Sequence, residues 1–415
     1  MARRTVMRSA GFGVLAAGTL AASGASAAGF DTPILYTARH QAMGGTAIGY
    51  VDDASAAFHN PAGLQGVRGL AFTGDFSLIL GKVRGSPTPS DNLESQTVVA
   101  PFFLLGGAYR VHEWLTLGVA AFPVASGGAE YKYPVGATNW IDKTEILFLE
   151  ASPLLSLNVP KDRWLPGKLA FGAGWRFNYV TFDRKRGEPD RLQYLDLEMS
   201  GKSFGGFRVG VQYQPIEPLK LGFVFRNKVT VTTEADSATV LTSEATNAAL
   251  DFTLPAKLGF GARLDLGHFG VASDVEYAFQ SQNKRPPLTG TLMGRDAQVQ
   301  NVFDWKNGVT WRNGVEYRIG DMPQVPLRIG YIYDSRVSNP IYPSAFGTPP
   351  AATHTFTFGA GYKRDTWQVN WAFSRRMGSA TVDTTDTRCV FCGYPGKYEI
   401  TMTGFYVDAS VDLPI

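Results

Sequence analysis

The residues best spaced for chemistry are two cysteines. Cys389 and Cys392 form a Cys-x-x-Cys segment, and the chain has no other cysteine. This spacing suits a redox dithiol or half of a metal site. A redox motif would lie in a βαβ pattern and a zinc site would need a second pair, and the sequence shows neither. We therefore predict a disulfide between Cys389 and Cys392 in an exported protein.

The other side chains form no recognisable catalytic set. The chain has five histidines, without the spacing that metal ligands need: His40, His59, His112, His268 and His354. Two glycine-rich segments, 259–261 and 359–361, lie within strand-like sequence and precede no helix, so they are not nucleotide loops. No serine is placed as in a nucleophile elbow, between a strand and a helix. The sequence therefore predicts no enzyme, no metal and no cofactor.

The composition leaves two fold classes. Hydrophobic residues make up 44% of the 415 residues, but the mean hydropathy is only -0.08. No mature segment has the roughly 18 continuous apolar residues that a membrane helix needs. The 46 glycines and 13% aromatic residues favour strands and turns. The net charge of +3 is spread along the chain and gives no basis for nucleic-acid binding.

The N-terminus has the features of an export signal. Three arginines come before residue 9, an apolar run extends from Ala10 to Ala22, and small residues follow at 25–27. This order is typical of a cleaved signal peptide, and a membrane helix would need a longer run. We predict cleavage after Ala27.

After residue 68, most of the chain alternates apolar and polar residues. Between Trp305 and Ile319, for example, Val309 and Trp311 alternate with Thr310 and Arg312. A period of two places the two sets on opposite faces of a strand. Because the apolar faces are aromatic-rich near strand ends and the polar faces carry glycine and both signs of charge, we expect lipid outside and a wet lumen inside.

The pattern predicts an all-β fold, a transmembrane antiparallel β-barrel of about fourteen strands. We expect these strands at 69–83, 97–111, 115–123, 144–157, 168–183, 194–214, 219–233, 250–264, 269–280, 304–319, 326–337, 352–363, 367–378 and 397–413. The connections alternate between short ones, such as 215–218, and long ones, such as 124–143, 234–249 and 281–303. Short periplasmic turns and longer outer loops are typical of outer-membrane barrels.

Residues 28–68 lack the strand pattern. A strand-free segment of about forty residues is too long for a simple lead-in, and a barrel wider than eight strands leaves an open interior. We therefore predict three parts: a signal peptide at 1–27, an N-terminal hatch at 28–68 that plugs the lumen, and a transmembrane β-barrel at 69–415.

Charged residues on the inner faces could be mistaken for an acid–base site: Asp274, Glu276, Arg312, Glu316 and Arg318. We predict instead that they form a paired network that satisfies buried polar groups under the plug.

Three short motifs carry a resemblance to a known family. They are the mature start Ala28-Gly29-Phe30, the hatch motif Asn60-Pro61-Ala62, and Leu254-Pro255-Ala256 in a middle strand. With them, nearly the whole mature chain resembles the FadL/TodX-type outer-membrane transporters of long-chain fatty acids and aromatic hydrocarbons. The resemblance implies a plugged barrel and a ligand path that leaves sideways, through a kink in the third strand.

The resemblance places the lateral gate at Phe122, Pro123, Gly127 and Gly128. Proline cannot donate to a β-ladder and glycine weakens one, so a gap in pairing is physically reasonable there. An ordinary strand end followed by a loop is the alternative. The chain departs from the family at 184–190, which is short and charged where the fatty-acid transporters have a long, partly helical loop that catches ligand.

We expect passive transport of hydrophobic molecules across the outer membrane, either long-chain fatty acids or aromatic and aliphatic hydrocarbons. Ligand would be captured at the outer loops, enter an apolar pocket above the hatch, and leave by the lateral gap. The expected partners are the ligand, outer-membrane lipid and lipopolysaccharide, and the barrel-assembly machinery, with the protein a monomer. A general porin and a structural or adhesion barrel are the alternatives. The plug argues against the first and the modest loops against the second. The sequence does not identify the ligand, because apolar pockets select by shape and size.

Overall fold

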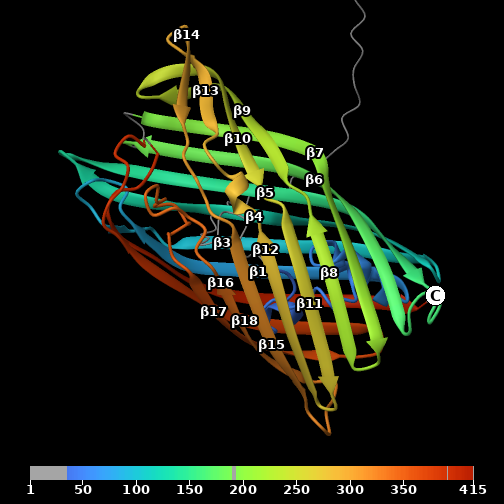
Figure 1. The fold of residues 1–415 in the computed structure, drawn as a ribbon. Helices are drawn as coiled ribbons and strands as arrows, with labels where there is room; N and C mark the ends of the chain where they lie inside the picture. The colour runs from blue at the N-terminus through green and yellow to red at the C-terminus, as the bar shows by residue number, and fades with distance from the viewer. Residues whose placement is uncertain (1–34, 189–192, 390, 415) are drawn as a thin grey trace, which may run out of the picture.

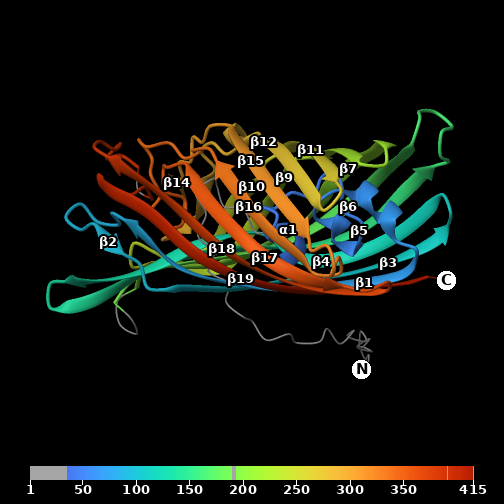
Figure 2. The same ribbon diagram turned by 90° about the horizontal axis from the view of Figure 1, so that it is seen from below.

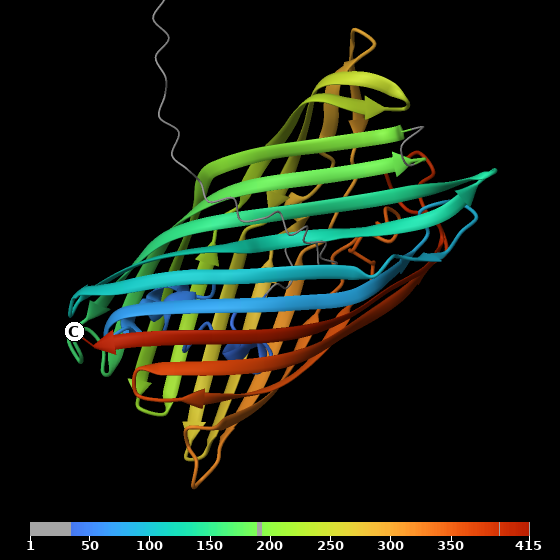
Figure 3. The same cartoon turned by 180° about the vertical axis from the view of Figure 1, so that it is seen from behind.

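The computed structural model describes residues 35–188, 193–389 and 391–414, which form one antiparallel sheet closed into a barrel (Figures 1 and 3). The sheet closes because β1 (Gly69–Gly85) pairs along its length with β19 (Gly396–Pro414). Closure gives partners to backbone groups that would have none in lipid. The expected signal peptide lies outside the described residues.

Fourteen strands make up the wall, as predicted, and four of them are interrupted. The continuous strands are β1, β3 (Val98–His112), β4 (Leu115–Val135), β5 (Thr138–Val159), β6 (Lys168–Gly187), β7 (Gln193–Ile216), β16 (Pro326–Asp334), β17 (Thr353–Lys363), β18 (Trp367–Val382) and β19. The interrupted strands are β8 (Leu219–Arg226) with β9 (Val229–Val240), β10 (Ser243–Leu254) with β11 (Lys257–Leu266), β12 (Phe269–Ala278) with β13 (Pro287–Leu292), and β14 (Arg295–Gln300) with β15 (Gly308–Arg318). A short strand, β2 (Leu93–Glu94), pairs with the outer end of β1, and a 3₁₀ turn, η3 (Gln280–Gln282), follows β12.

The period of two decides which side chains face outward. On β15, Val309 and Trp311 are exposed while Arg312 is buried. The prediction was wrong at Trp305, which is only 5% exposed. The strand begins at Gly308, so the alternation does not extend back to Trp305 and its side chain lies inside.

The predicted sorting of the connections by length holds only in part, because the expected long loops 124–143, 234–249 and 281–303 each contain a hairpin with a two-residue turn. At the end where β19 finishes, two-residue turns join β3 to β4, β7 to β8 and β11 to β12. At the other end, the expected loop 124–143 is instead a hairpin, because β4 runs to Val135 and β5 starts at Thr138 (Figure 2). Pairing continues past Pro123 through a β-bulge, since β5 supplies partners along one edge. The expected loop 234–249 likewise forms the β9–β10 hairpin.

The described part of the predicted hatch, residues 35–68, lies within the barrel, toward the end where β19 finishes (blue in Figures 1 and 3). It contains α1 (Ala38–Gln41), η1 (Ala54–Ala57) and η2 (Pro61–Gly66). Nearly every residue from Leu35 to Leu64 is buried. Among the described helices, none has the length and apolar character to cross a membrane.

Ile329 offers a test of the outward face, because it lies in the middle of β16 and is 62% exposed. Ile329→Arg should lower the free energy of unfolding by about 2–4 kcal/mol, the cost of arginine near the bilayer midplane. Met293→Arg is the control, since Met293 is 77% exposed in the turn after β13 and should tolerate the charge. Urea titrations in lipid vesicles would measure both, and equal stabilities would contradict the assignment of this face to lipid.

Candidate functional site

The hatch is tied to the wall by Asn60, whose side chain is fully buried. Its Oδ1 accepts a hydrogen bond from the backbone N–H of Ala62 at 3.2 Å and so caps η2, which begins with Pro61. Its Nδ2 donates to the carbonyl oxygens of Ile48 in the hatch at 2.8 Å and of Val211 in β7 at 3.1 Å. One amide thus joins two hatch segments to the barrel, and all three residues of the predicted hatch motif lie at this contact.

Two wall glycines allow this close approach. A Cβ on Gly210 would overlap Asn60 Oδ1, and a Cβ on Gly172 would overlap the backbone nitrogen of Ala62. Any larger residue would therefore have to displace the hatch.

Charged residues of the wall provide further contacts with the hatch backbone. Asp274 Oδ2 accepts a hydrogen bond from the N–H of Ala47 at 2.8 Å. Arg208 and Arg226 both donate to the carbonyl oxygen of Phe58, at 3.0 and 2.8 Å. These bonds satisfy polar groups that would be costly to bury unpaired.

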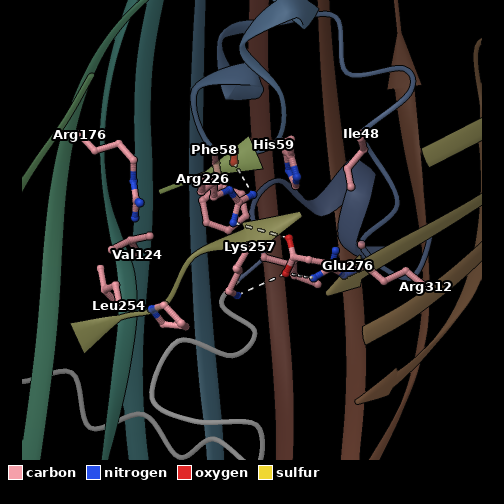
Figure 4. Close-up of a pocket in the computed structure, with 13 residues that line it drawn as sticks. Ile48, Phe58, His59, Val124, Arg176, Arg226, Leu254, Lys257, Glu276 and Arg312 are labelled. Atoms are coloured by element: carbon pink, nitrogen blue, oxygen red, sulfur yellow. Dashed lines mark hydrogen bonds and ion pairs between the residues drawn. The ribbon is translucent and has the colours of Figure 1, made fainter. Parts of the chain in front are cut away.

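Four of the five inner charges singled out from the sequence are in ion pairs, as Figure 4 shows for Glu276, whereas Asp274 instead accepts hydrogen bonds from the backbone of the hatch. The ion pairs join Glu276 to Lys257 and Arg312, Glu316 to Arg263 and Arg328, and Asp265 to Arg318. The pairs around Glu276 and Glu316 are buried, so removing one partner would leave an uncompensated charge, whereas Asp265 and Arg318 are partly exposed.

Within the described part of the hatch, Arg39 forms ion pairs with Asp52 and Asp53, and two histidines are buried. Burial alone would raise the pKa of Asp52, but the Arg39 guanidinium, 2.5 Å away, holds it well below its usual range. Burial lowers the pKa of His59 to about 3 and that of His40 well below its ordinary value. The two imidazole rings lie 4.9 Å apart, a proximity that the sequence did not reveal.

Within the described part of the chain, one group of side chains has metal-ligand geometry, and it lies away from the hatch. It comprises Asp183, Asp196 and Glu198 on β6 and β7. Lys143 and Lys185 pair with these carboxylates, so their charge is already compensated.

The wall is incomplete between β3 and β4. Their ladder ends where Leu105 faces Ala121. Farther out, β3 continues to pair with β1, and β4 continues to pair with β5. A backbone hydrogen bond, from the N–H of Gln96 to the carbonyl oxygen of Glu130 at 2.7 Å, links the two sides again. Over the described residues in between, two strand edges face each other without a ladder.

The residues expected at the lateral gate lie on the β4 side of this break: Phe122, Pro123, Gly127 and Gly128. All residues from 122 to 129 are buried, so β4 leaves the in–out alternation here and lies against the interior. The β-bulge between Pro123 and Ala125 marks where this departure begins.

The hatch contacts β4 at this point. The hydroxyl of Tyr36 donates a hydrogen bond to the carbonyl oxygen of Pro123 at 2.6 Å. The rings of Tyr36 and Phe58 pack against Phe122, with centroids 5.8 and 5.5 Å away. The kinked part of β4 is thus held from inside the barrel.

An apolar cavity of about 100 Å³ lies in the outer part of the barrel. The strands β5, β6, β7 and β10 supply part of its lining, including Phe182, Leu197, Leu250 and Phe252. Trp305 lies in its lining, which explains the burial of this residue. Among the described residues of the lining, Arg184 is the one with a charged side chain.

A smaller cavity of about 30 Å³ adjoins the hatch (Figure 4). Its lining includes Phe58 and His59 of the hatch, Val124 of β4, and Leu254 at the break between β10 and β11. One cluster of packed hydrophobic residues contains Phe58, Val124, Leu254, Phe252 and Trp305. Apolar packing is therefore continuous from the outer cavity to the hatch and to the β4 edge of the wall break.

Cys389 and Cys392 form a disulfide in the outer loop after β18, with Cα atoms 5.4 Å apart. Phe391, between them, lines the outer cavity. The sequence pointed to the cysteines but not to Phe391 or Trp305 as cavity residues. The available signal for Phe391 was its position inside the Cys-x-x-Cys segment.

Asn60→Ala should loosen the hatch without unfolding the barrel. It removes the cap of η2 and three bonds from Nδ2, and each buried carbonyl left unpaired costs about 1–3 kcal/mol. Ion conductance in planar bilayers should rise, while the heat-dependent gel migration of a folded barrel stays unchanged. Gln65→Ala, which removes one Nε2 bond to Gln212, is the control and should remain closed. If Asn60→Ala conducts no better than this control, Asn60 does not hold the hatch in place.

The chain matches one family model and several solved structures. A family model described as "Outer membrane protein transport protein (OMPP1/FadL/TodX)" matches residues 18–410. No curated protein sequence matches the chain. The structure of a FadL homologue from Pseudomonas aeruginosa has a TM-score of 0.71 at 15% identity, with the match covering 93% of this chain and 100% of that one. For the Pseudomonas putida toluene transporter TodX, the TM-score is 0.70 at 17% identity, with 94% and 100% covered. For the Ralstonia pickettii toluene transporter TbuX, it is 0.65 at 15% identity, with 93% and 99% covered. At these identities the structures show a shared fold.

Proposed function

This chain belongs to the OMPP1/FadL/TodX family of outer membrane transport proteins, and on that premise we propose that it passes small hydrophobic molecules through the outer membrane without converting them. The observation that carries the proposal is the apolar cavity, which lies in a lumen that elsewhere holds paired charges. An apolar molecule gains free energy by leaving water for such a surface. Solved relatives are described as toluene transporters and a monoaromatic hydrocarbon channel. Hydrocarbons and long-chain fatty acids are the proposed ligand classes.

The proposed route leaves the barrel sideways. The buried hatch blocks a straight path to the inner end. From the outer cavity, the apolar cluster leads to Val124, beside the break between β3 and β4. On the β3 side, Phe103 and Leu105 are exposed on the outer face, so a molecule that passes the break meets lipid. A hatch shift that withdraws Tyr36 from Pro123 would open the gate formed by the predicted β4 residues.

The two alternatives have less support. A general porin needs a water-filled lumen, but buried hydrogen bonds anchor the hatch, and one of the donors, Arg208, is itself paired with Glu150. An adhesion barrel needs large outer surfaces, whereas several outer connections are narrow hairpins, such as those joining β4 to β5 and β9 to β10.

We also propose how the protein reaches the outer membrane. The arginines and apolar run near the N-terminus support export and cleavage near Ala27. A belt of exposed apolar side chains, including Phe72, Phe356 and Trp371, supports direct contact with outer-membrane lipid and lipopolysaccharide. Insertion by the barrel-assembly machinery and function as a monomer complete the proposal.

Filling the cavity should block transport. Leu197 lines it from β7 and is only 1% exposed, so Leu197→Trp places a bulky ring in the route. Uptake of labelled toluene or oleic acid by cells should fall at least about tenfold, because even one extra methylene in an apolar pocket typically changes discrimination between substrates by that factor or more. Leu221→Trp is the control, because Leu221 faces outward on β8, and it should transport normally.

Conductance decides between the two leading functions. The intact protein should conduct ions far less than an open porin. If the intact protein conducts ions freely, and Leu197→Trp takes up toluene and oleic acid at the same rate as the Leu221→Trp control, the protein is a general porin and not a transporter of hydrophobic molecules.

A further inference from the structure

Two outer loops meet over the apolar cavity. Phe346, in the loop between β16 and β17, and Phe391, in the loop between β18 and β19, both line it. Both side chains are half-buried and pack against the main hydrophobic cluster. The loops are also bonded to each other, since the N–H of Gly393 donates to the carbonyl oxygen of Pro343 at 2.7 Å. Together they form a roof at the outer end of the cavity.

The first loop is fixed to the barrel wall. The hydroxyl of Tyr131 on β4 donates to the carbonyl oxygen of Ala345 at 2.5 Å. The Tyr131 ring packs edge-on against Phe346, with centroids 5.6 Å apart. The guanidinium of Arg184 on β6 lies 4.7 Å from the centroid of the Phe346 ring. Phe346 therefore has a defined place in the roof.

The second loop is fixed by its disulfide. The N–H of Cys389 donates to the carbonyl oxygen of Asp386, and the N–H of Asp386 donates to that of Ile341, both at 3.1 Å. Phe391 lies inside the ring closed by Cys389 and Cys392. A surface loop is normally mobile and ordering it costs conformational entropy, so closing this short ring favours one position of Phe391.

The volume and the charge of the cavity limit which molecules can bind beneath the roof. Its volume of about 100 Å³ is below the roughly 150 Å³ of an engineered protein cavity that binds benzene. The cavity therefore has room for no more than a single ring or a short apolar segment at a time. Its one charged lining residue, Arg184, is already paired with Asp142. An acidic head group would find no further cation among the described lining residues.

We propose that the Cys389–Cys392 disulfide positions Phe391 in this roof, where Phe391 and Phe346 restrict the transporter to compact, neutral apolar molecules. The inference rests on the proposed transport function and names the ligand class that this site accepts. The disulfide acts as a permanent constraint in the oxidising space outside the cell. Outer-loop capture of ligand is thereby assigned to the loops after β16 and β18.

The test compares uptake of two neutral probes, toluene and the three-ring phenanthrene, by cells expressing the full-length protein. Phe391→Ala should raise phenanthrene uptake at least about tenfold relative to toluene, because it removes a ring from the roof of an apolar pocket. The double change Cys389→Ser with Cys392→Ser should shift the same ratio in the same direction. Ile341→Ala is the matched control, since Ile341 is an exposed side chain of the neighbouring loop and should leave the ratio unchanged. Phe391→Trp should lower toluene uptake.

The possible results distinguish failure of this inference from failure of the proposed transport function. If the intact protein takes up toluene but Phe391→Ala, Phe391→Trp and the cysteine pair all keep the wild-type ratio, the roof does not select ligands and the inference fails alone. If the intact protein transports none of toluene, phenanthrene and oleic acid above empty-vector cells, the proposed function fails as well. Should Phe391→Ala not assemble, as judged by heat-dependent gel migration, the Phe391→Trp variant decides the question.

Discussion

Inside a membrane, every backbone N–H and C=O must find a partner within the protein, and the whole structure depends on this constraint. Pairing of β1 with β19 meets it by closing the wall. Between β3 and β4 the ladder stops beyond Leu105 and Ala121, so the backbone there needs partners from the interior. There Tyr36 of the hatch bonds to the carbonyl oxygen of Pro123. The wall break and the hatch are therefore coupled, because moving the hatch removes a partner at the break.

The interior has a charged part near the hatch and an apolar part farther out. Toward the hatch, buried charges bond to each other and to the hatch backbone, as Glu150 does with Arg176 and Arg208, and as Arg208 does with Phe58. Breaking such a pair is costly, so these contacts fix the hatch in one position. Farther out the lining is apolar and contacts a ligand without directional bonds. A molecule can therefore move along that surface as far as the gate before the hatch has to shift.

The local parts of the fold were predictable and the long-range parts were not. A period of two is visible in any single strand, which is why the strand count and the inward position of Arg312 followed from the sequence. Pro123 and Gly127 resembled a strand end, but the partner strand β5 extends the pairing past them. Trp305 and Phe391 become cavity residues only because interrupted strands and distant loops converge there. The motif at Asn60 was recognisable, whereas its partner Val211 is 151 residues away in the sequence.

Lateral movement of an apolar molecule can be tested directly by soaking crystals with bromobenzene and locating bromine by its anomalous scattering. A lateral apolar route predicts one bromine position in the outer cavity, between Phe252 and Trp305, and a second near Val124 at the wall break. Bromine found only on the lipid-facing surface, with ordered water filling the cavity, would contradict it.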